Sequence, residues 1–258
     1  GIAHTRWATH GIPSETNAHP HICENLALVH NGIIENFASL KEDLLKQGYQ
    51  FKSQTDTEVL VCLIHSHLKN SSSVFEAFKK ALKEVKGSFG LALIDKNDPD
   101  TLYAARSGSP LIIGLGIGEN FIASDTLALL PVTRRFIYLE ENELAVLTTE
   151  EVNVYDLEGN KIEKQIVESD LDAESISKGK FRHFMQKEIY EQPKTVTDTL
   201  APRIKDGKVV IEELGMSDED ILKVDRLRIV ACGSAYHVGI SVKYIFEGMA
   251  RIPVEVDA

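Results

Sequence analysis

The amino-acid sequence predicts an α+β fold in which helices are layered on a sheet-rich core, followed by the beginning of an α/β unit. Apolar residues recur at helical spacing in three segments between Leu40 and Gly87, which indicates amphipathic helices. From Ser88 to about Val154 they occur instead in short runs separated by Gly, Asn, Asp and Pro, a pattern typical of consecutive antiparallel strands. A last apolar run near Val230 enters a turn of small residues and then a further helical pattern, which indicates a βα unit.

The first predicted elements are strands. Residues 1–4 (GIAH) have no initiator Met before them, and we expect them to lie in an apolar strand of a protein that begins upstream. Residues 26–30 (LALVH) form a second β-rich run. The Asn31-Gly32 pair that follows tolerates positive φ, so it predicts a tight turn after this strand.

Three helices and seven strands are predicted next. The helices cover the apolar positions of residues 40–45, 59–63 and 74–82. We expect Thr55 or Asp56 to cap the second helix, because their side-chain oxygens can accept hydrogen bonds from the first backbone N–H groups. The strands are expected at residues 89–94, 101–105, 110–115 and 121–124 and around Ile137, Leu144 and Val154.

A polar stretch divides the chain. We therefore predict a first domain, a linker and a second domain over residues 1–172, 173–182 and 183–258. The second domain should contain a helix, a buried strand, a longer helix and a next strand around residues 185–190, 228–231, 238–249 and 252–256. The sequence ends before a parallel sheet could be completed, so we expect this domain to be truncated.

Composition and charge disfavour several classes of function. The 258 residues are 43% hydrophobic and 26% charged, which is typical of a globular protein. A formal net charge of -11 disfavours nonspecific binding of nucleic acid, since phosphates are repelled by an acidic surface. Cys23, Cys62 and Cys232 follow no CxxC spacing, and neither a signal peptide nor a run of 18 apolar residues is present. We expect a cytoplasmic protein.

The segment HTRWATHG holds the first candidate functional residues. The guanidinium of Arg6 can hold a carboxylate in a bidentate manner, and Thr9 and His10 could add donors to the same anion. The alternative is a surface ion pair for Arg6 with Trp7 in the core. A metal site is disfavoured because the histidines match no familiar ligand spacing; they are His4, His10, His19, His21 and His30.

Two further clusters could bind charged groups. The side-chain amide of Asn31 beside the backbone N–H of Gly32 could stabilise a developing oxyanion, although the pair could also be a plain turn. Asp56 could receive a substrate ammonium or simply cap its helix. The turn from Cys232 to Ser234 could bring backbone N–H groups to a phosphate, or could be a plain connection. It matches neither GxGxxG nor a P-loop, which disfavours NAD and ATP.

Together these segments resemble one family. The strings GIAHTRWATHGIPSETNAHPH, VHNGIIEN, SQTDTEV, AARSGSPLIIGLG, ENFIASD, MQKEIYEQP and ACGSAYH are similar, in this order, to the isomerising glutamine–fructose-6-phosphate aminotransferases. The resemblance implies an N-terminal-nucleophile-type αββα sandwich, incomplete at its N-terminus, followed by the start of an α/β sugar isomerase domain. It implies transfer of the L-glutamine amide nitrogen to D-fructose 6-phosphate, giving D-glucosamine 6-phosphate and L-glutamate, without a metal or organic cofactor.

The same resemblance implies a role for each candidate residue. The glutamine-binding residues would be Arg6, Trp7, Thr9, His10, Gly32 and Asp56. Asn31 and Gly32 would form the oxyanion hole, and Cys232, Gly233 and Ser234 would form one wall of the sugar-phosphate site. Ala235 stands where many relatives have Ser, so one hydroxyl contact to the phosphate is in doubt.

The resemblance also implies features beyond these residues. The family nucleophile is a cysteine at the mature N-terminus, and Gly1 does not match it, so we expect the nucleophile to lie outside this sequence. A homodimer formed through the isomerase domain is implied as well. The alternative functions are a catalytically inactive glutamine-binding regulatory module and a histidine-based metal hydrolase.

Overall fold

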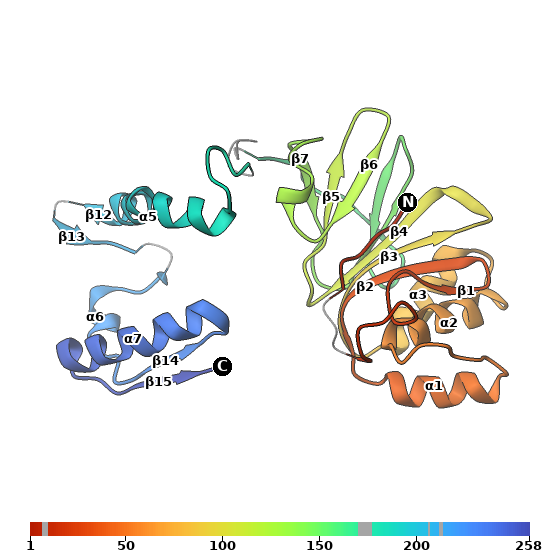
Figure 1. The fold of residues 1–258 in the computed structure, drawn as a ribbon, viewed down its shortest axis with the longest axis horizontal. Helices are drawn as coiled ribbons and strands as arrows, with labels where there is room; N and C mark the ends of the chain where they lie inside the picture. Colours follow the sequence, from red (N-terminus) through yellow and green to blue (C-terminus); the bar gives the residue numbers. More distant parts are fainter. Residues whose placement is uncertain (7–9, 170–176, 206, 212–213) are drawn as a thin grey trace. The chain divides into compact units, whose positions relative to one another are not determined.

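The computed structural model describes residues 1–6, 10–169, 177–205, 207–211 and 214–258. It contains two compact units, Gly1–Gly179 and Lys180–Ala258, which we describe separately (Figure 1). The division between the units falls within the segment that the sequence suggests as a linker.

The first unit contains two antiparallel sheets. The larger sheet has the order β1-β2-β3-β4-β8-β9-β10 and the smaller sheet the order β11-β7-β5-β6. The strands of the larger sheet are β1 (His21–Cys23), β2 (Leu26–Ile34), β3 (Gly87–Asp95), β4 (Asp98–Ser107), β8 (Glu143–Leu147), β9 (Val152–Tyr155) and β10 (Lys161–Ile162). Those of the smaller sheet are β5 (Ile112–Leu115), β6 (Asn120–Ala123), β7 (Arg135–Tyr138) and β11 (Val167–Glu168).

Three helices cover one face of the larger sheet (Figure 1). They are α1 (Phe37–Lys46), α2 (Asp56–Leu68) and α3 (Val74–Glu84). Residues 56–64 of α2 are all buried, because this helix lies between the sheet and its two neighbouring helices. Phe78 of α3 and Leu91 of β3 belong to the same core and are fully buried. This core holds the first residue of α2 against the sheet.

A second core lies between the two sheets. Small residues of the larger sheet, Ala104 and Ala145, face Ile113 and Ile137 of the smaller one. On its other side the smaller sheet packs Phe136 against a loop that includes the short 3-10 helix η1 (Thr126–Ala128). The layers are therefore helices, sheet and sheet, with η1 as the outer element in the described part of the unit.

The second unit begins with α5 (Phe184–Leu200), η2 (Ala201–Arg203) and the hairpin of β12 (Ile204–Lys205) and β13 (Lys208–Val209). After α6 (Asp218–Ile221), strand β14 (Leu227–Val230) enters α7 (Gly233–Ala250), which returns to β15 (Val254–Asp257). The two strands are parallel, with Leu227 opposite Val254. Gly239 of α7 approaches Ile229 closely, which brings the helix down onto the pair. This is the predicted βα unit.

Several predictions from the sequence are confirmed. The three helices of the first unit and all seven predicted strands from β3 to β9 are present, and the α+β class is correct. Thr55 caps α2, and its side chain accepts a hydrogen bond from the Glu58 backbone N–H. In the described chain, no helix is both long and apolar enough to cross a membrane.

Three predictions are wrong. Residues 1–4 form no strand. Asn31 and Gly32 lie inside β2 rather than in a turn, because the positive φ of Gly32 serves a close approach to the neighbouring strand. The strand at residues 228–231 is not buried, since Val230 is 71% exposed. The hairpin β12–β13 and helix α6 were not predicted.

Candidate functional site

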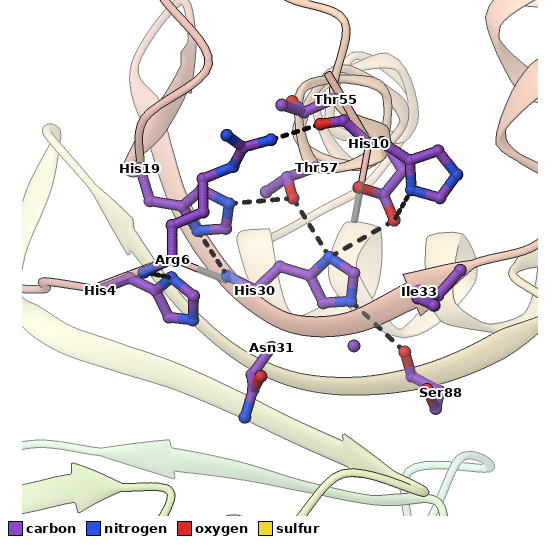
Figure 2. A pocket seen from close by; sticks show the side chains of 12 residues that line it. His4, Arg6, His10, His19, His30, Asn31, Ile33, Thr55, Thr57 and Ser88 are labelled. Atoms are coloured by element: carbon purple, nitrogen blue, oxygen red, sulfur yellow. Dashed lines mark hydrogen bonds and ion pairs between the residues drawn. The ribbon is translucent and has the colours of Figure 1, made fainter. Parts of the chain in front are cut away.

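A pocket of about 260 Å³ lies where β2, the N-terminus of α2 and the first residues of the chain meet (Figure 2). Five residues singled out from the sequence line it together: Arg6, His10, Asn31, Gly32 and Asp56. The other lining residues are His4, His19, His30, Ile33, Thr55, Thr57 and Ser88. Two of the predicted glutamine-binding residues, Trp7 and Thr9, lie outside the described residues.

Asp56 is held in place by its own hydrogen bond. It is the first residue of α2, directly after the cap Thr55, and its Oδ2 accepts from the backbone N–H of Ile34 at 2.8 Å. The side chain is only 5% exposed. A helix N-terminus favours a negative charge, which helps to offset the cost of burying a carboxylate here. Asp56 therefore places a fixed anionic group at one side of the pocket.

His10 brings an unsatisfied polar atom to the same place. Its Nδ1 lies 3.9 Å from Oδ2 of Asp56, beyond hydrogen-bond distance, while its ring packs edge-on against Phe37. This Nδ1 is buried and has no hydrogen-bond partner among the described residues. Buried polar atoms are normally paired, so a ligand or water in the pocket would complete this one.

Arg6 supplies the positive charge of the pocket. Its Nη2 donates to the backbone carbonyl oxygens of His10 and Gly11, the latter at 3.2 Å. Its backbone has a φ of 46°, in the left-handed region, and its N–H donates to Nδ1 of His4 at 3.0 Å. Positive φ is uncommon for a residue with a side chain and occurs often at functional sites.

The loop after His10 is anchored by Asn17. This buried side chain donates from Nδ2 to the Ile12 carbonyl oxygen at 2.9 Å and accepts from the Gln54 backbone N–H at 2.9 Å. Gly11 has a φ of 76°, and a side chain there would lie 2.7 Å from Nδ2 of Asn17. The loop that carries His10 is thus tied to the segment that precedes α2.

Three residues that line the pocket, His19, Thr57 and His30, form a chain of hydrogen bonds (Figure 2). The backbone N–H of His30 donates to Nδ1 of His19 at 3.2 Å, and Nε2 of His19 lies 3.4 Å from the Thr57 hydroxyl. That hydroxyl lies 3.2 Å from Nδ1 of His30. Nε2 of His30 lies 3.4 Å from the Ser88 carbonyl oxygen.

These contacts define one arrangement of protons. The Ser88 carbonyl oxygen can only accept a hydrogen bond, so Nε2 of His30 carries a proton. Nδ1 of His19 accepts from the His30 backbone N–H, so the proton of the His19 ring is on Nε2. The Thr57 hydroxyl then accepts from His19 and donates to Nδ1 of His30. This assignment, inferred from the hydrogen-bond partners, leaves both rings neutral.

The electrostatics agree with neutral rings. Burial, helped by the neighbouring histidines and Arg6, lowers the pKa of His19 from 6.5 to about 3. Burial also lowers the pKa of His30 and of His4. Beside these rings, the Arg6 guanidinium and the Asp56 carboxylate line the pocket. The pocket thus offers one cation and one anion to a ligand.

Asn31 and Gly32 form the wall contributed by β2. Gly32 lies opposite Phe89 of β3 and has a φ of 138°, and a side chain there would overlap the Ser88 carbonyl oxygen. The Asn31 side chain points away from Thr57 (Figure 2), because neighbouring residues of a strand face opposite sides of the sheet. Asn31 also lines a second cavity of about 440 Å³ between the two sheets. It therefore lies at the junction of the two cavities.

The predicted phosphate-binding turn lies in the second unit. Cys232 is the exposed residue before α7, and Gly233, with a φ of 61°, begins the helix together with Ser234. The turn connects β14 to α7 as predicted. Its residues belong to a different unit from the pocket.

The sequence did not single out Thr57 or Ser88. Thr57 directly follows Asp56 at the start of α2, and this position was the only signal for it in the sequence. Ser88 contributes its backbone carbonyl oxygen, which no pattern of side chains reveals. His19 and His30, which form the hydrogen-bond chain with Thr57, were considered only as metal ligands. Among the described residues, no group of three or more His, Cys, Asp and Glu side chains is placed to hold a metal ion.

Comparison with known proteins agrees with the geometry. Residues 4–131 match the family model of the glutamine amidotransferase domain. Over all 258 residues the chain is 52% identical to a glutamine–fructose-6-phosphate aminotransferase (isomerising) of Escherichia coli and 53% identical to one of Haemophilus influenzae. The chain spans 42% of the length of each of these relatives.

A solved structure shows the same fold. The glutamine phosphoribosylpyrophosphate amidotransferase from B. subtilis, complexed with ADP and GMP, matches with a TM-score of 0.51 and 22% identity. The match covers 98% of this chain and 50% of that chain. It confirms that the chain has a mixed α/β fold like that of this amidotransferase. On the family model and the identity to the aminotransferases, residues 4–131 belong to the glutamine amidotransferase family.

Proposed function

We propose that the pocket between β2 and α2 binds L-glutamine. The observation that carries this proposal is the pairing of the Arg6 cation with the Asp56 anion in a pocket where His4, His19 and His30 have lowered pKa values. An α-amino acid carries a carboxylate and an ammonium on one carbon. Arg6 and His10 would receive its carboxylate, and Asp56 would receive its ammonium. Trp7 and Thr9 would complete the binding loop.

In the same proposal, the glutamine side chain extends toward Asn31 and Gly32. When a thiolate attacks its amide, negative charge develops on the carbonyl oxygen, and the Asn31 amide and the Gly32 backbone N–H would stabilise it. Ammonia then leaves, and water releases L-glutamate. The attacking thiol is not among the lining residues, since neither Cys23, Cys62 nor Cys232 lines the pocket. The pocket supplies binding and charge stabilisation.

For the whole protein, we propose that the ammonia is transferred to D-fructose 6-phosphate to give D-glucosamine 6-phosphate, in the cytoplasm. Support comes from the identity of about one half to aminotransferases named for this acceptor, which extends over both units. Residues 1–172 would be the glutaminase domain, joined by a linker to the start of a sugar isomerase domain at residue 183. The turn from Cys232 to Ser234 would form one wall of the sugar-phosphate site.

We also propose that the protein forms a homodimer through its isomerase domain. Large apolar side chains at the surface of α7 support a covered face in the second unit: Tyr244 is 70% exposed and Met249 82% exposed. An inactive glutamine-binding module is the second candidate function. Such a module would need only the binding groups that line the pocket, such as Arg6, His10 and Asp56.

A binding experiment tests the glutamine proposal. Calorimetric titration of the chain with L-glutamine and L-glutamate should show binding, whereas glutarate, which lacks the ammonium, should bind at least tenfold more weakly because Asp56 loses its partner. Asp56→Asn should bring the affinities for L-glutamate and glutarate closer together. Asp43→Asn, which removes an exposed carboxylate of α1, is the matched control and should leave both unchanged. Equal affinity for the two ligands in the unmodified chain would exclude this role for Asp56.

A kinetic experiment tests the aminotransferase proposal in the complete protein. Arg6→Lys keeps the charge but loses the planar fork, so glutamine-dependent synthesis of D-glucosamine 6-phosphate should fall far more than synthesis from free ammonia. Equal losses with the two nitrogen donors would refute the assignment of Arg6. Glutamine binding without any product formation in the complete protein would favour the inactive module.

A further inference from the structure

A second polar pocket of the first unit shares no lining residue with the proposed glutamine site. It has a volume of about 410 Å³ and is formed by the end of β1, the segment after α1 and one face of α2. Two cysteines line it, Cys23 and Cys62. The proposed amidotransferase reaction uses neither of them.

The two thiols meet although they are 39 positions apart in the sequence. Cys23 is the last residue of β1 and Cys62 lies in the middle of α2, and both are free. Their side chains line the same pocket and belong to one buried cluster, and β1 packs directly against α2. Cys23 is 8% exposed and Cys62 3% exposed, so the pocket is the route by which a small molecule reaches them.

The surroundings make the two sulfurs unequal. The neighbouring Cys62 thiol, together with the positive charge of Lys69, lowers the pKa of Cys23, whereas the Cys23 side chain and burial raise the pKa of Cys62. Lys69 is held in the pocket by its position 4.6 Å above the ring of Tyr49, whose hydroxyl lies 2.8 Å from Nδ1 of His65. Nucleophilic attack requires a thiolate, so Cys23 is the more reactive partner.

We propose that Cys23 and Cys62 form a hydroperoxide-reactive dithiol that closes to an intramolecular disulfide between β1 and α2. The Cys23 thiolate attacks one oxygen of hydrogen peroxide, the O–O bond breaks, and the released hydroxide takes a proton to become water. Cys62 then attacks the sulfur of the Cys23 sulfenic acid and loses its proton. The S–O bond breaks and a second water leaves. Two thiols are oxidised by two electrons, and one peroxide is reduced to two waters.

The location gives this bond a structural consequence. β1 also contains His21, whose Nε2 lies 3.0 Å from the hydroxyl of Thr55, the cap of α2. A disulfide would add a covalent link between the two elements that already meet beside the proposed glutamine pocket. Reduction by a dithiol would remove it.

The test uses the full chain and hydrogen peroxide. One equivalent of peroxide should reduce the thiols counted after denaturation from three to one per chain, and the intact mass should fall by two hydrogens. Peptide mapping should find one cross-linked pair containing Cys23 and Cys62, and dithiothreitol should restore three thiols. Oxygen adducts on single cysteines without this cross-link, or no reaction, would overturn the proposal.

Variants separate the roles of the two sulfurs. Cys232→Ser, which removes the exposed cysteine of the other unit, is the matched control and should still lose two thiols to one peroxide. In the Cys62→Ser variant, oxidation should stop at a sulfenic acid on Cys23, which dimedone traps. In the Cys23→Ser variant, Cys62 should stay unmodified. Faster trapping at Cys62 than at Cys23 would contradict the assignment. The mapping of the unmodified chain decides the proposal even if a variant does not fold.

Discussion

The Asp56 carboxylate accepts a hydrogen bond from the backbone N–H of Ile34 at 2.8 Å, so the first residue of α2 is tied to the last residue of β2. One carboxylate thereby aligns the two elements that form the pocket. It also faces His10 and His30, whose Nδ1 atoms lie 3.9 and 3.8 Å from Oδ2. Structural and binding roles therefore coincide in Asp56, and substitutions of different size can separate them.

Asp56→Asn and Asp56→Ala should differ in stability but not in binding. Asn retains an oxygen for the Ile34 N–H, so the free energy of unfolding should change by less than about 1 kcal/mol, whereas Ala leaves this buried donor unpaired and should cost about 1 to 3 kcal/mol. Both variants should lose affinity for L-glutamate. Urea unfolding and calorimetry measure the two effects; full affinity in Asp56→Asn would contradict a charge-based role.

Asn31→Ala should lower turnover rather than affinity. If the Asn31 amide stabilises only the oxyanion that forms during attack, its removal should reduce glutamine hydrolysis in the complete protein by about a hundredfold or more, with little change in glutamine affinity. Steady-state kinetics and direct titration give the two numbers. Loss of affinity with turnover intact would remove Asn31 from the oxyanion role.

Gly32→Ala should destabilise the fold strongly. A methyl group at this position would overlap the Ser88 carbonyl oxygen of the paired strand, so we expect a loss of at least about 3 kcal/mol in the free energy of unfolding. Gly48→Ala is the matched control, because Gly48 also has positive φ, 91°, but has nothing within 4 Å of the added carbon. A similar loss in both variants would show that backbone strain, and not the contact with Ser88, explains the effect.

Acid should destabilise the protein through His19. Burial, helped by the neighbouring His4, His21, His30 and Arg6, lowers its pKa from 6.5 to about 3. Between these values the unfolded chain binds a proton that the folded chain does not, so stability falls as the pH decreases from 6.5 toward 3. His19→Asn retains an acceptor for the His30 N–H without titrating. Urea unfolding at about pH 7 and about pH 5 should show a smaller loss in this variant than in the unmodified chain.

Glu58 should act on stability in a lower pH range. Burial alone would raise its pKa, but hydrogen bonds from the backbone N–H groups of Lys52 and Ser53 and from the Ser53 hydroxyl lower it below the ordinary 4.5. Its stabilising contribution is therefore present above pH 4.5 and is lost as the pH falls through the lowered pKa. Glu58→Gln should cost about 1 to 3 kcal/mol at neutral pH, and this difference should shrink in acid. A difference independent of pH would contradict this account.

Much of the fold and several site residues could be predicted from the sequence. Helical spacing over residues 74–82 and short apolar runs from Ser88 onward follow from which side chains a helix or strand must bury, so these elements were found correctly. Arg6 and Asp56 were singled out as candidates because a guanidinium can hold a carboxylate and a carboxylate at a helix start can receive an ammonium. Their proposed roles came from the family resemblance. The tertiary structure brings both into one pocket.

The sequence by itself determined the elements and the chemical types that line the pocket, whereas the tertiary structure decided their protonation and geometry. A glycine such as Gly32 can adopt positive φ in a turn or where two strands approach closely. Only the pairing of Gly32 with β3 distinguishes the two cases. The proton positions on His19 and His30 depend on Thr57, which lies 38 and 27 positions away from them in the chain. Proton positions follow from distances between side chains of different elements, and these distances exist only once the chain has folded.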